Sequence, residues 1–299
     1  MDGQNPEPVR AFVLGGGSDN VTVIDTARHE AIATIAVGSE PMLAALSPDG
    51  RTLLVTNRDS WNVSVVDTRT LQVVQTVPVQ DGASGCGFTP DGRRALVCNE
   101  HSHTVSLLDT ATWTVDAHVH IGKGPCDLRM LPNGRHAVVS CEESHDTVVL
   151  DAFSGEKLQS IPTPEGPLGL ALGPGGRFLL VACFVSNDLY AIDTESWLVG
   201  WRMKVGSSHI GCTVTPNGRA GLITNGDQDY VSIVDLVKRR EAARIQVRAN
   251  PSAVALVPGT SLAYITNRGA HCVSVVDLKT RETLREVPCG SSPLSLCIG

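Results

Sequence analysis

An aspartate recurs at a fixed spacing along the whole chain, and this spacing is the feature that most limits the possible folds. The stretch that ends at Asp67 reads RTLLVTNRDSWNVSVVD, and versions of it lead to each of the other aspartates, 42 residues apart, without insertion or deletion. Self-similarity at such a period is the signature of a repeat protein, in which every unit has the same local structure. The seven positions are Asp25, Asp67, Asp109, Asp151, Asp193, Asp235 and Asp277.

Each unit predicts four short β-strands. In the second unit they read MLAALSPDGR, TLLVTN, NVSVVD and LQVVQTVPV, and turns rich in Pro, Asp, Gly and Asn separate them. Runs such as LLVTN are apolar at successive positions, which is expected when a small sheet is covered on both faces by its neighbours. The aspartate that ends the third strand is predicted to accept backbone N–H bonds from the following turn.

The two ends of the chain complete one another. Residues 11–40 contain three strands of a unit, while residues 293–299 match the first strand of the second unit and then stop. Pairing this last strand with the first unit would close a ring and remove the open sheet edges of a linear array. The 299 residues therefore predict an all-β, seven-bladed β-propeller with four antiparallel strands per blade. It forms one domain over residues 11–299, after a polar tail at residues 1–10.

The second strands also carry a family resemblance. Val55-Thr56-Asn57, Ile223-Thr224-Asn225 and Tyr264-Ile265-Thr266-Asn267, with the VSVVD or VSIVD that follows them, resemble the YVTN-repeat β-propellers. That group overlaps the seven-bladed lactonase-like propellers and includes surface-layer, periplasmic and enzyme-like proteins. The resemblance extends over about residues 11–299 and implies the propeller fold. It implies little about activity, because the motif residues build blades and do not form a site.

Composition excludes several function classes. Lys and Arg number 24 against 31 Asp and Glu, and the net charge of −7 argues against a nucleic-acid partner. The chain has no stretch of about 18 apolar residues and no signal-peptide pattern, so we expect a cytoplasmic protein without a membrane partner. The nine cysteines show neither a disulfide framework nor paired zinc-ligand spacing. Oligomeric state is not predicted.

Ligands of propellers bind at the funnel where the loops entering the innermost strands meet the loops between second and third strands. Residues that break the repeat there are the candidates, because repeat-keeping residues are already explained by folding. His209 stands where five other units have proline, so it could be a general acid or base, or a histidine bonded to a neighbouring blade. The residues that open the innermost strands are Pro41, Ala83, Pro125, Pro167, His209, Pro251 and Pro293.

Blade four contributes two charges and a thiol to the predicted funnel. Asp127 and Arg129 occupy channel positions at which the other units have mostly small residues. The two side chains could neutralise each other or orient an anionic or polar ligand. Cys126 lies near the entrance, where it could contact a substrate or act as a nucleophile. The alternative for Cys126 is an inert thiol packed inside the blade.

The loops between second and third strands gather further charges. Glu100 and His101 lie in the unit next to that of Glu142, and Arg58 and Arg268 lie on flanking units. This set could form an acid–base site, an anion-binding arginine pair, or a metal site of His and carboxylate ligands. None of the spacings is diagnostic of a metal. We therefore expect no metal and no other cofactor, with a divalent metal ion as the open alternative.

The sequence leads to two functional hypotheses. In the first, the chain is an enzyme acting on a small polar molecule at the funnel, as a lactonase-like hydrolase or a lyase, isomerase or cyclase. His209 would be the acid or base, helped by Glu100, Glu142 or His101, and Arg58, Arg268 or Arg129 would hold negative charge, with Asp127 and Cys126 also contacting substrate. In the second, the chain is a non-catalytic ligand-binding or protein-interaction scaffold.

Overall fold

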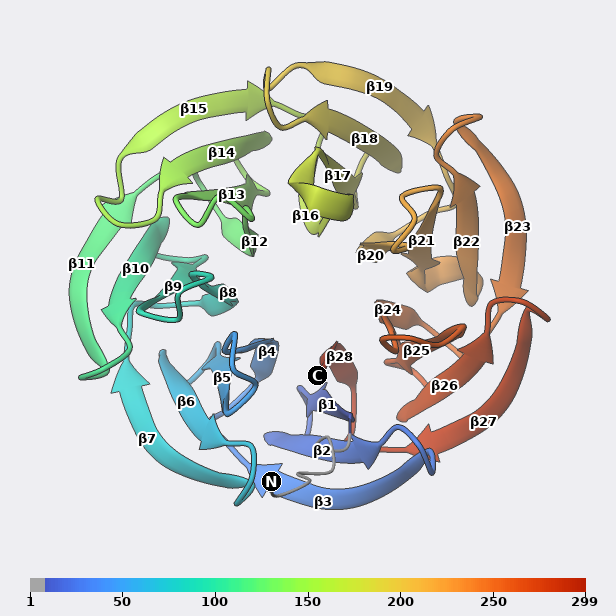
Figure 1. Cartoon of the computed structure of the whole chain (residues 1–299), viewed down its shortest axis with the longest axis horizontal. Coiled ribbons are helices and arrows are strands. Elements are labelled where there is room, and N and C mark those ends of the chain that lie inside the picture. Colours follow the sequence, from blue (N-terminus) through green and yellow to red (C-terminus); the bar gives the residue numbers. More distant parts are fainter. Residues whose placement is uncertain (1–8) are drawn as a thin grey trace, which may run out of the picture.

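A computed structural model describes residues 9–299 and confirms the predicted architecture. Seven four-stranded antiparallel sheets are arranged radially around a central axis (Figure 1). The ring closes where β28 (Pro293–Ile298) pairs with β1 (Arg10–Gly15), in a register that places Ala11 opposite Ile298. Residues 1–8 of the predicted tail lie outside the described residues.

The blades are numbered in chain order, and each uses the same strand succession from the axis outwards. From blade 1 to blade 7, they contain β28, β1, β2 (Asn20–Asp25) and β3 (Glu30–Ala36); β4 (Pro41–Leu46), β5 (Thr52–Asn57), β6 (Asn62–Asp67) and β7 (Gln72–Pro78); β8 (Ala83–Phe88), β9 (Arg94–Asn99), β10 (Thr104–Asp109) and β11 (Thr114–His120); β12 (Pro125–Met130), β13 (His136–Cys141), β14 (Asp146–Asp151) and β15 (Lys157–Pro162); β16 (Pro167–Leu172), β17 (Phe178–Cys183), β18 (Asp188–Asp193) and β19 (Val199–Lys204); β20 (His209–Val214), β21 (Ala220–Asn225), β22 (Tyr230–Asp235) and β23 (Arg240–Gln246); β24 (Pro251–Leu256), β25 (Leu262–Asn267), β26 (Cys272–Asp277) and β27 (Glu282–Pro288).

Helical structure is confined to two short 3-10 turns among the described residues, η1 (Pro174–Gly176) and η2 (Gly226–Gln228). Residues 9–299 contain no helix that is long and apolar enough to span a membrane.

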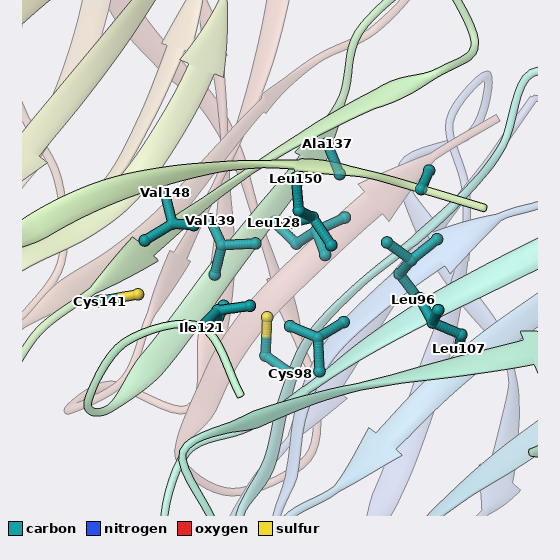
Figure 2. Packing of buried hydrophobic residues seen from close by; sticks show 12 residues of the cluster. Leu96, Cys98, Leu107, Ile121, Leu128, Ala137, Val139, Cys141, Val148 and Leu150 are labelled. Atoms are coloured by element: carbon teal, nitrogen blue, oxygen red, sulfur yellow. The ribbon is translucent and has the colours of Figure 1, made fainter. Parts of the chain in front are cut away.

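The hydrophobic core is divided among the blade interfaces. Seven clusters of buried residues are found in the described chain, and each joins two neighbouring blades. Figure 2 shows the cluster between blades 3 and 4, in which Leu96 and Leu107 of one blade pack with Val139 and Leu150 of the other. Both faces of each middle strand are therefore covered, which explains the continuous apolar runs of the sequence.

The repeated turns have the chemistry that the sequence predicted. The Asp67 carboxylate accepts the N–H groups of Arg69 at 2.8 Å and of Thr70 at 3.0 Å, and five of the other marker aspartates bind two N–H groups in the same way. In the turn between the first two strands of blade 2, Gly50 has a φ of 71°, a conformation that glycine adopts without a steric penalty.

In several blades, a buried hydroxyl on the second strand forms a hydrogen bond to the next blade. The pairing of β4 with β5 is irregular between Pro41 and Ala44, so the N–H of Leu43 has no ladder partner. Thr56 supplies one, because its hydroxyl accepts that N–H at 3.0 Å and lies 2.6 Å from the Ser84 carbonyl of blade 3. Ser140 in blade 4 and Thr224 in blade 6 make equivalent contacts.

Replacing Thr56 with valine tests this link between blades. Valine keeps the shape but removes the hydroxyl, so the groups that it bound would be left without a partner. We expect the free energy of unfolding, measured by urea denaturation, to fall by about 1–3 kcal/mol. Thr70→Val, on an exposed turn, is the control and should change it by less than about 0.5 kcal/mol. Equal stability of the two variants would contradict the proposed role of Thr56.

Candidate functional site

The geometry of the site begins at the end of the second strand. Asn57 is fully buried, and its Nδ2 atom donates to the Ser64 hydroxyl at 2.9 Å and to Asn62 Oδ1 at 2.7 Å. The next residue, Arg58, donates its backbone N–H to the carbonyl of Glu40 in the loop that enters β4, at 3.0 Å. These bonds fix the backbone on both sides of Arg58, so that its side chain reaches the mouth of the funnel.

The same backbone bond recurs in all seven blades. We call the residue that donates it the rim residue, and the distances from its nitrogen to the entering loop range from 2.7 to 3.2 Å. One register position of the 42-residue unit thus surrounds the mouth. The rim residues of blades 1 to 7 are Gly16, Arg58, Glu100, Glu142, Phe184, Gly226 and Arg268.

A cavity of about 380 Å³ lies inside this ring. Five rim residues line it, all except the two glycines, and Asp127 and Arg129 line it deeper in the channel. Its walls are completed by the second residue of every innermost strand, which we call the entry residue. The entry residues of blades 1 to 7 are Leu294, Met42, Ser84, Cys126, Leu168, Ile210 and Ser252.

An ion pair joins two rim residues of neighbouring blades. Arg58 Nη2 lies 3.0 Å from Glu100 Oε1 and 3.2 Å from His101 Nε2. Because arginine can only donate, Nε2 of His101 is the acceptor, and the proton is assigned to Nδ1, which lies 3.2 Å from Asp81 Oδ1. His101 therefore supports Arg58 from outside the cavity, and a neutral imidazole satisfies both contacts.

Glu100 has an environment suited to proton transfer. Burial raises the pKa of its carboxyl above the ordinary value, and nearby Glu142 and Glu143 add to the increase, while Arg58 and His101 oppose it. A carboxyl whose pKa is moved towards neutrality can hold or release a proton under working conditions. Of the predicted acid–base residues whose side chains are described, Glu100 best fits that role.

Cys126 lies between the two carboxylates. Its Sγ atom is 3.7 Å from Glu142 Oε2 and 3.1 Å from the carbonyl of Gly124. Ligand atoms of Glu100, Cys126 and Glu142 all lie within 4.8 Å of one another. Burial, together with the two negative charges, raises the pKa of the thiol, so Cys126 is a poor nucleophile and acts here as a neutral wall of the cavity.

Asp127 and Arg129 form the polar floor of the cavity. The Asp127 carboxylate accepts the N–H of Leu128 at 2.8 Å and the N–H of Leu170, from blade 5, at 2.9 Å. It also binds Arg129 Nη1 at 2.5 Å. Asp127 is therefore an internal partner for three donors and a link between two blades, whereas Arg129 lines the cavity and also donates Nη1 to the Leu128 carbonyl at 2.8 Å.

Two opposite charges at the mouth have no ionic partner among the side chains that the structure describes. In the described part of the chain, Arg58 and Arg129 form ion pairs, whereas Arg268 does not. The Nε atom of Arg268 instead donates to the Ser292 hydroxyl at 3.0 Å. Within the same residues Glu142 has no cationic partner either. Blade 7 and blade 4, which carry Arg268 and Glu142, lie on opposite sides of the ring (Figure 1).

The structure brings most of the predicted site residues together. The cavity is lined by seven of them: Arg58, Glu100, Cys126, Asp127, Arg129, Glu142 and Arg268. His101 stands behind Arg58 at the rim. His209 opens β20 at the entrance, as its place in the repeat predicts, but its side chain lies outside the described part of the structure.

Sequence reasoning missed the apolar part of the wall. Phe184 shares the register position of the charged rim residues, and Ile210 and Leu168 are entry residues. A column of residues read at 42-residue intervals from Arg58 would have identified the complete rim. Two other histidines of these loops are structural, since His103 and His271 each accept an N–H of the loop that enters the next blade.

Comparisons with known proteins agree with the fold. A family model described as YNCE-like beta-propeller matches residues 9–132, from the region of β1 to that of β12. The chain is a β-propeller. The comparison does not name the YVTN-repeat group, so only the broader part of that resemblance is confirmed. No curated protein matches the chain.

Two solved structures resemble the whole propeller. Hydrazine synthase of Kuenenia stuttgartiensis is 22% identical, with a TM-score of 0.81, over 93% of this chain and 98% of that one. A functionally unknown protein from Desulfotomaculum acetoxidans is 13% identical, with a TM-score of 0.83, over 97% of this chain and 98% of that one. At these identities the likeness shows the fold alone.

Removing the Asp127 carboxylate should greatly lower the stability of the folded protein. Asp127→Ala leaves two backbone N–H groups and the Arg129 guanidinium without their acceptor, and we expect a loss of about 3–5 kcal/mol in the free energy of unfolding. Asp116→Ala is the matched control, because Asp116 pairs with Arg94 on the surface at 3.0 Å. Its expected effect is at most about 1 kcal/mol. Comparable losses in urea denaturation would show that Asp127 is not a structural link.

Proposed function

We propose that the funnel cavity binds a small polar molecule and converts it by acid–base chemistry. The observation that carries this proposal is the rim itself, because the charged residues that break the repeat share one register position and line one cavity. Titratable residues with a shifted pKa that converge on a cavity are typical of active sites. The scaffold does not require charges there, since two blades have glycine at the same position.

Glu100 is proposed as the proton-transferring group. Its carboxyl is partly buried at the mouth, and Arg58 holds it at 3.0 Å in one orientation. Glu142 is the second carboxylate, close enough that the two could act as acid and base on one substrate. His209 stays a proposed partner because its backbone opens β20 at the entrance. Arg58, Arg268 and Arg129 are proposed to bind negative charge.

The environment of the Cys126 thiol argues against a reaction in which a cysteine is the nucleophile. Raised pKa values make Cys126 and the neighbouring Cys86 poor nucleophiles. The proposed chemistry is therefore proton transfer to or from the bound molecule, or attack by a water that a carboxylate activates. Lactone hydrolysis, elimination, isomerisation and cyclisation all use such a step. A cytoplasmic location remains part of the proposal and is supported by seven buried free thiols.

One observation favours the second candidate, a binding protein without turnover. Glu100 already carries an ion pair with Arg58, and that contact opposes the rise of its pKa. A carboxylate held in this way could serve only to position Arg58 for ligand binding. Product formation distinguishes the two candidates: NMR of the protein with a panel of lactones, hydroxy acids and amino acids would show either new product signals or ligand binding alone.

Glu100→Gln should separate activity from stability. We expect turnover in the NMR panel to fall at least about 100-fold, because glutamine cannot exchange the proton. Stability should change in the opposite direction. The raised pKa means that the folded protein favours the neutral acid, so above that pKa the carboxylate lowers stability and glutamine avoids the loss. The variant should melt at a higher temperature at pH 7, and the difference should disappear below about pH 4.

Glu195→Gln, at an exposed glutamate that does not contribute to the pKa of Glu100, is the control and should leave both quantities unchanged. A Glu100→Gln variant with full turnover would refute the catalytic role. A variant that is less stable than the wild type at pH 7 would instead show that the ion pair with Arg58 outweighs the cost of burial.

A further inference from the structure

We propose that the ligand of the funnel cavity is a zwitterion whose carboxylate binds at Arg268 and whose ammonium group binds at Glu142. This inference rests on the proposed function, since it names the substrate class of the same cavity. It predicts a molecule in which several bonds separate the two charges, such as an ω-amino acid or a dipeptide. The reason is that the two side chains stand on opposite sides of one mouth.

The positive side of the mouth is formed by blades 7, 1 and 2. Arg268 Nε is fixed by the Ser292 hydroxyl, and this leaves the terminal guanidinium nitrogens for a ligand. Arg58 places a second guanidinium on blade 2, but its charge is already paired with Glu100 at 3.0 Å and lies 4.0 Å from Glu40, so Arg268 is the main anion-binding group. Between them, Gly16 has no side chain, and a Cβ atom there would lie 2.4 Å from Leu294 Cδ1. An anionic group that enters over blade 1 thus meets arginines on both sides.

The negative side is formed by blades 3 and 4. Glu100 is already paired with Arg58, so its charge is largely compensated. Among the side chains that the structure describes, Glu142 contacts Cys126, with its Oε2 3.7 Å from Sγ, and no cation. A carboxylate that is partly buried in a cavity and lacks a cationic partner favours the binding of a positively charged ligand group. An ammonium group supplies three donors for this purpose.

A divalent metal ion is the competing occupant of this side. The ligand atoms of Glu100, Cys126 and Glu142 are close enough to share one. Binding of a metal would place a second cation on Glu100, whose Oε1 already binds Arg58 at 3.0 Å, and it would require the thiol to lose its proton although burial opposes that loss. An ammonium group needs only the free carboxylate of Glu142 and disturbs neither contact. The geometry therefore favours the organic cation.

An apolar wall lies next to the negative side. Phe184 on blade 5 and the entry residues Leu168 and Ile210 line the cavity there. On blade 6 the rim residue is Gly226, which leaves the mouth open between Phe184 and Arg268. A chain of methylene groups or an apolar side chain of a dipeptide could pack on this wall while the charged ends reach Glu142 and Arg268.

Three matched probes test the inference with the full-length protein. 6-Aminohexanoate carries both charges, whereas hexanoate and hexylamine each carry one. We expect NMR titration to show that 6-aminohexanoate binds at least tenfold more tightly than either analogue. Arg268→Ala should weaken its binding at least tenfold without affecting hexylamine. Glu142→Gln should also weaken the binding of 6-aminohexanoate at least tenfold, without affecting the binding of hexanoate. Arg281→Ala, on an exposed turn, is the control and should leave the binding of all three probes unchanged.

Several outcomes would overturn the inference. Equal affinities for 6-aminohexanoate and hexanoate would show a simple anion site. Equal affinities for 6-aminohexanoate and hexylamine would show a simple cation site. Failure of all three probes to bind would also reject it. Stoichiometric binding of Zn²⁺ that is lost in Cys126→Ser would show that a metal occupies the negative side.

The same experiment separates this inference from the proposed function. Zwitterion binding without turnover of any compound would reject the catalytic proposal and leave the ligand assignment intact. Turnover of a compound that is not zwitterionic, with no binding of 6-aminohexanoate, would reject the ligand assignment alone.

Discussion

The end of the second strand is the point on which the rest of the structure depends. There, a buried hydroxyl such as that of Thr56 satisfies the irregular N–H of its own innermost strand and contacts a carbonyl of the next blade. The following residue, Asn57, closes the hairpin to the third strand from a fully buried position. A buried polar group that lacked these partners would cost free energy, so the two residues fix the strand end in one arrangement.

This arrangement separates the scaffold from the site. The residue after the second strand uses its backbone to bind the entering loop in every blade, and its side chain takes no part in that bond. Arginine, glutamate, phenylalanine and glycine all occur there, because none of the bonds that hold the blade involves that side chain. The propeller can therefore carry a mouth with positive, negative and apolar sectors without a change in the blades, and we infer ligand chemistry from those sectors.

The sequence predicted the fold well because folding information repeats every 42 residues. Six complete copies of one strand pattern, together with a seventh divided into three strands at the start of the chain and one at its end, determined the blades and the closure of the ring. The candidate site was predicted less completely. Arg58, Glu100 and Glu142 were recognised as charges that break the repeat, but Phe184 was overlooked, since an apolar residue in a loop carries no obvious signal when it is read alone.

Side-chain direction was the hardest property to predict. The sequence left open whether Cys126 reaches the funnel or packs inside its blade, and the structure shows that it lines the cavity. The cause is the irregular pairing of β12 with β13 between Pro125 and Leu128, which changes the direction of the first residues of the strand. Periodicity in a sequence does not show such an irregularity. The pairing of Arg58 with Glu100 likewise depends on side-chain reach between blades, which only the three-dimensional structure provides.

The claim that one register position carries the ligand chemistry is tested most directly by exchanging two rim residues. In the double variant Glu142→Phe with Phe184→Glu, the composition is unchanged, but the negative charge moves by one blade. The account predicts a melting temperature within about 2 °C of the wild type, the shift that about 1 kcal/mol produces in a chain of this size. It also predicts loss of 6-aminohexanoate binding. Unchanged binding, or a protein that no longer folds, would contradict it.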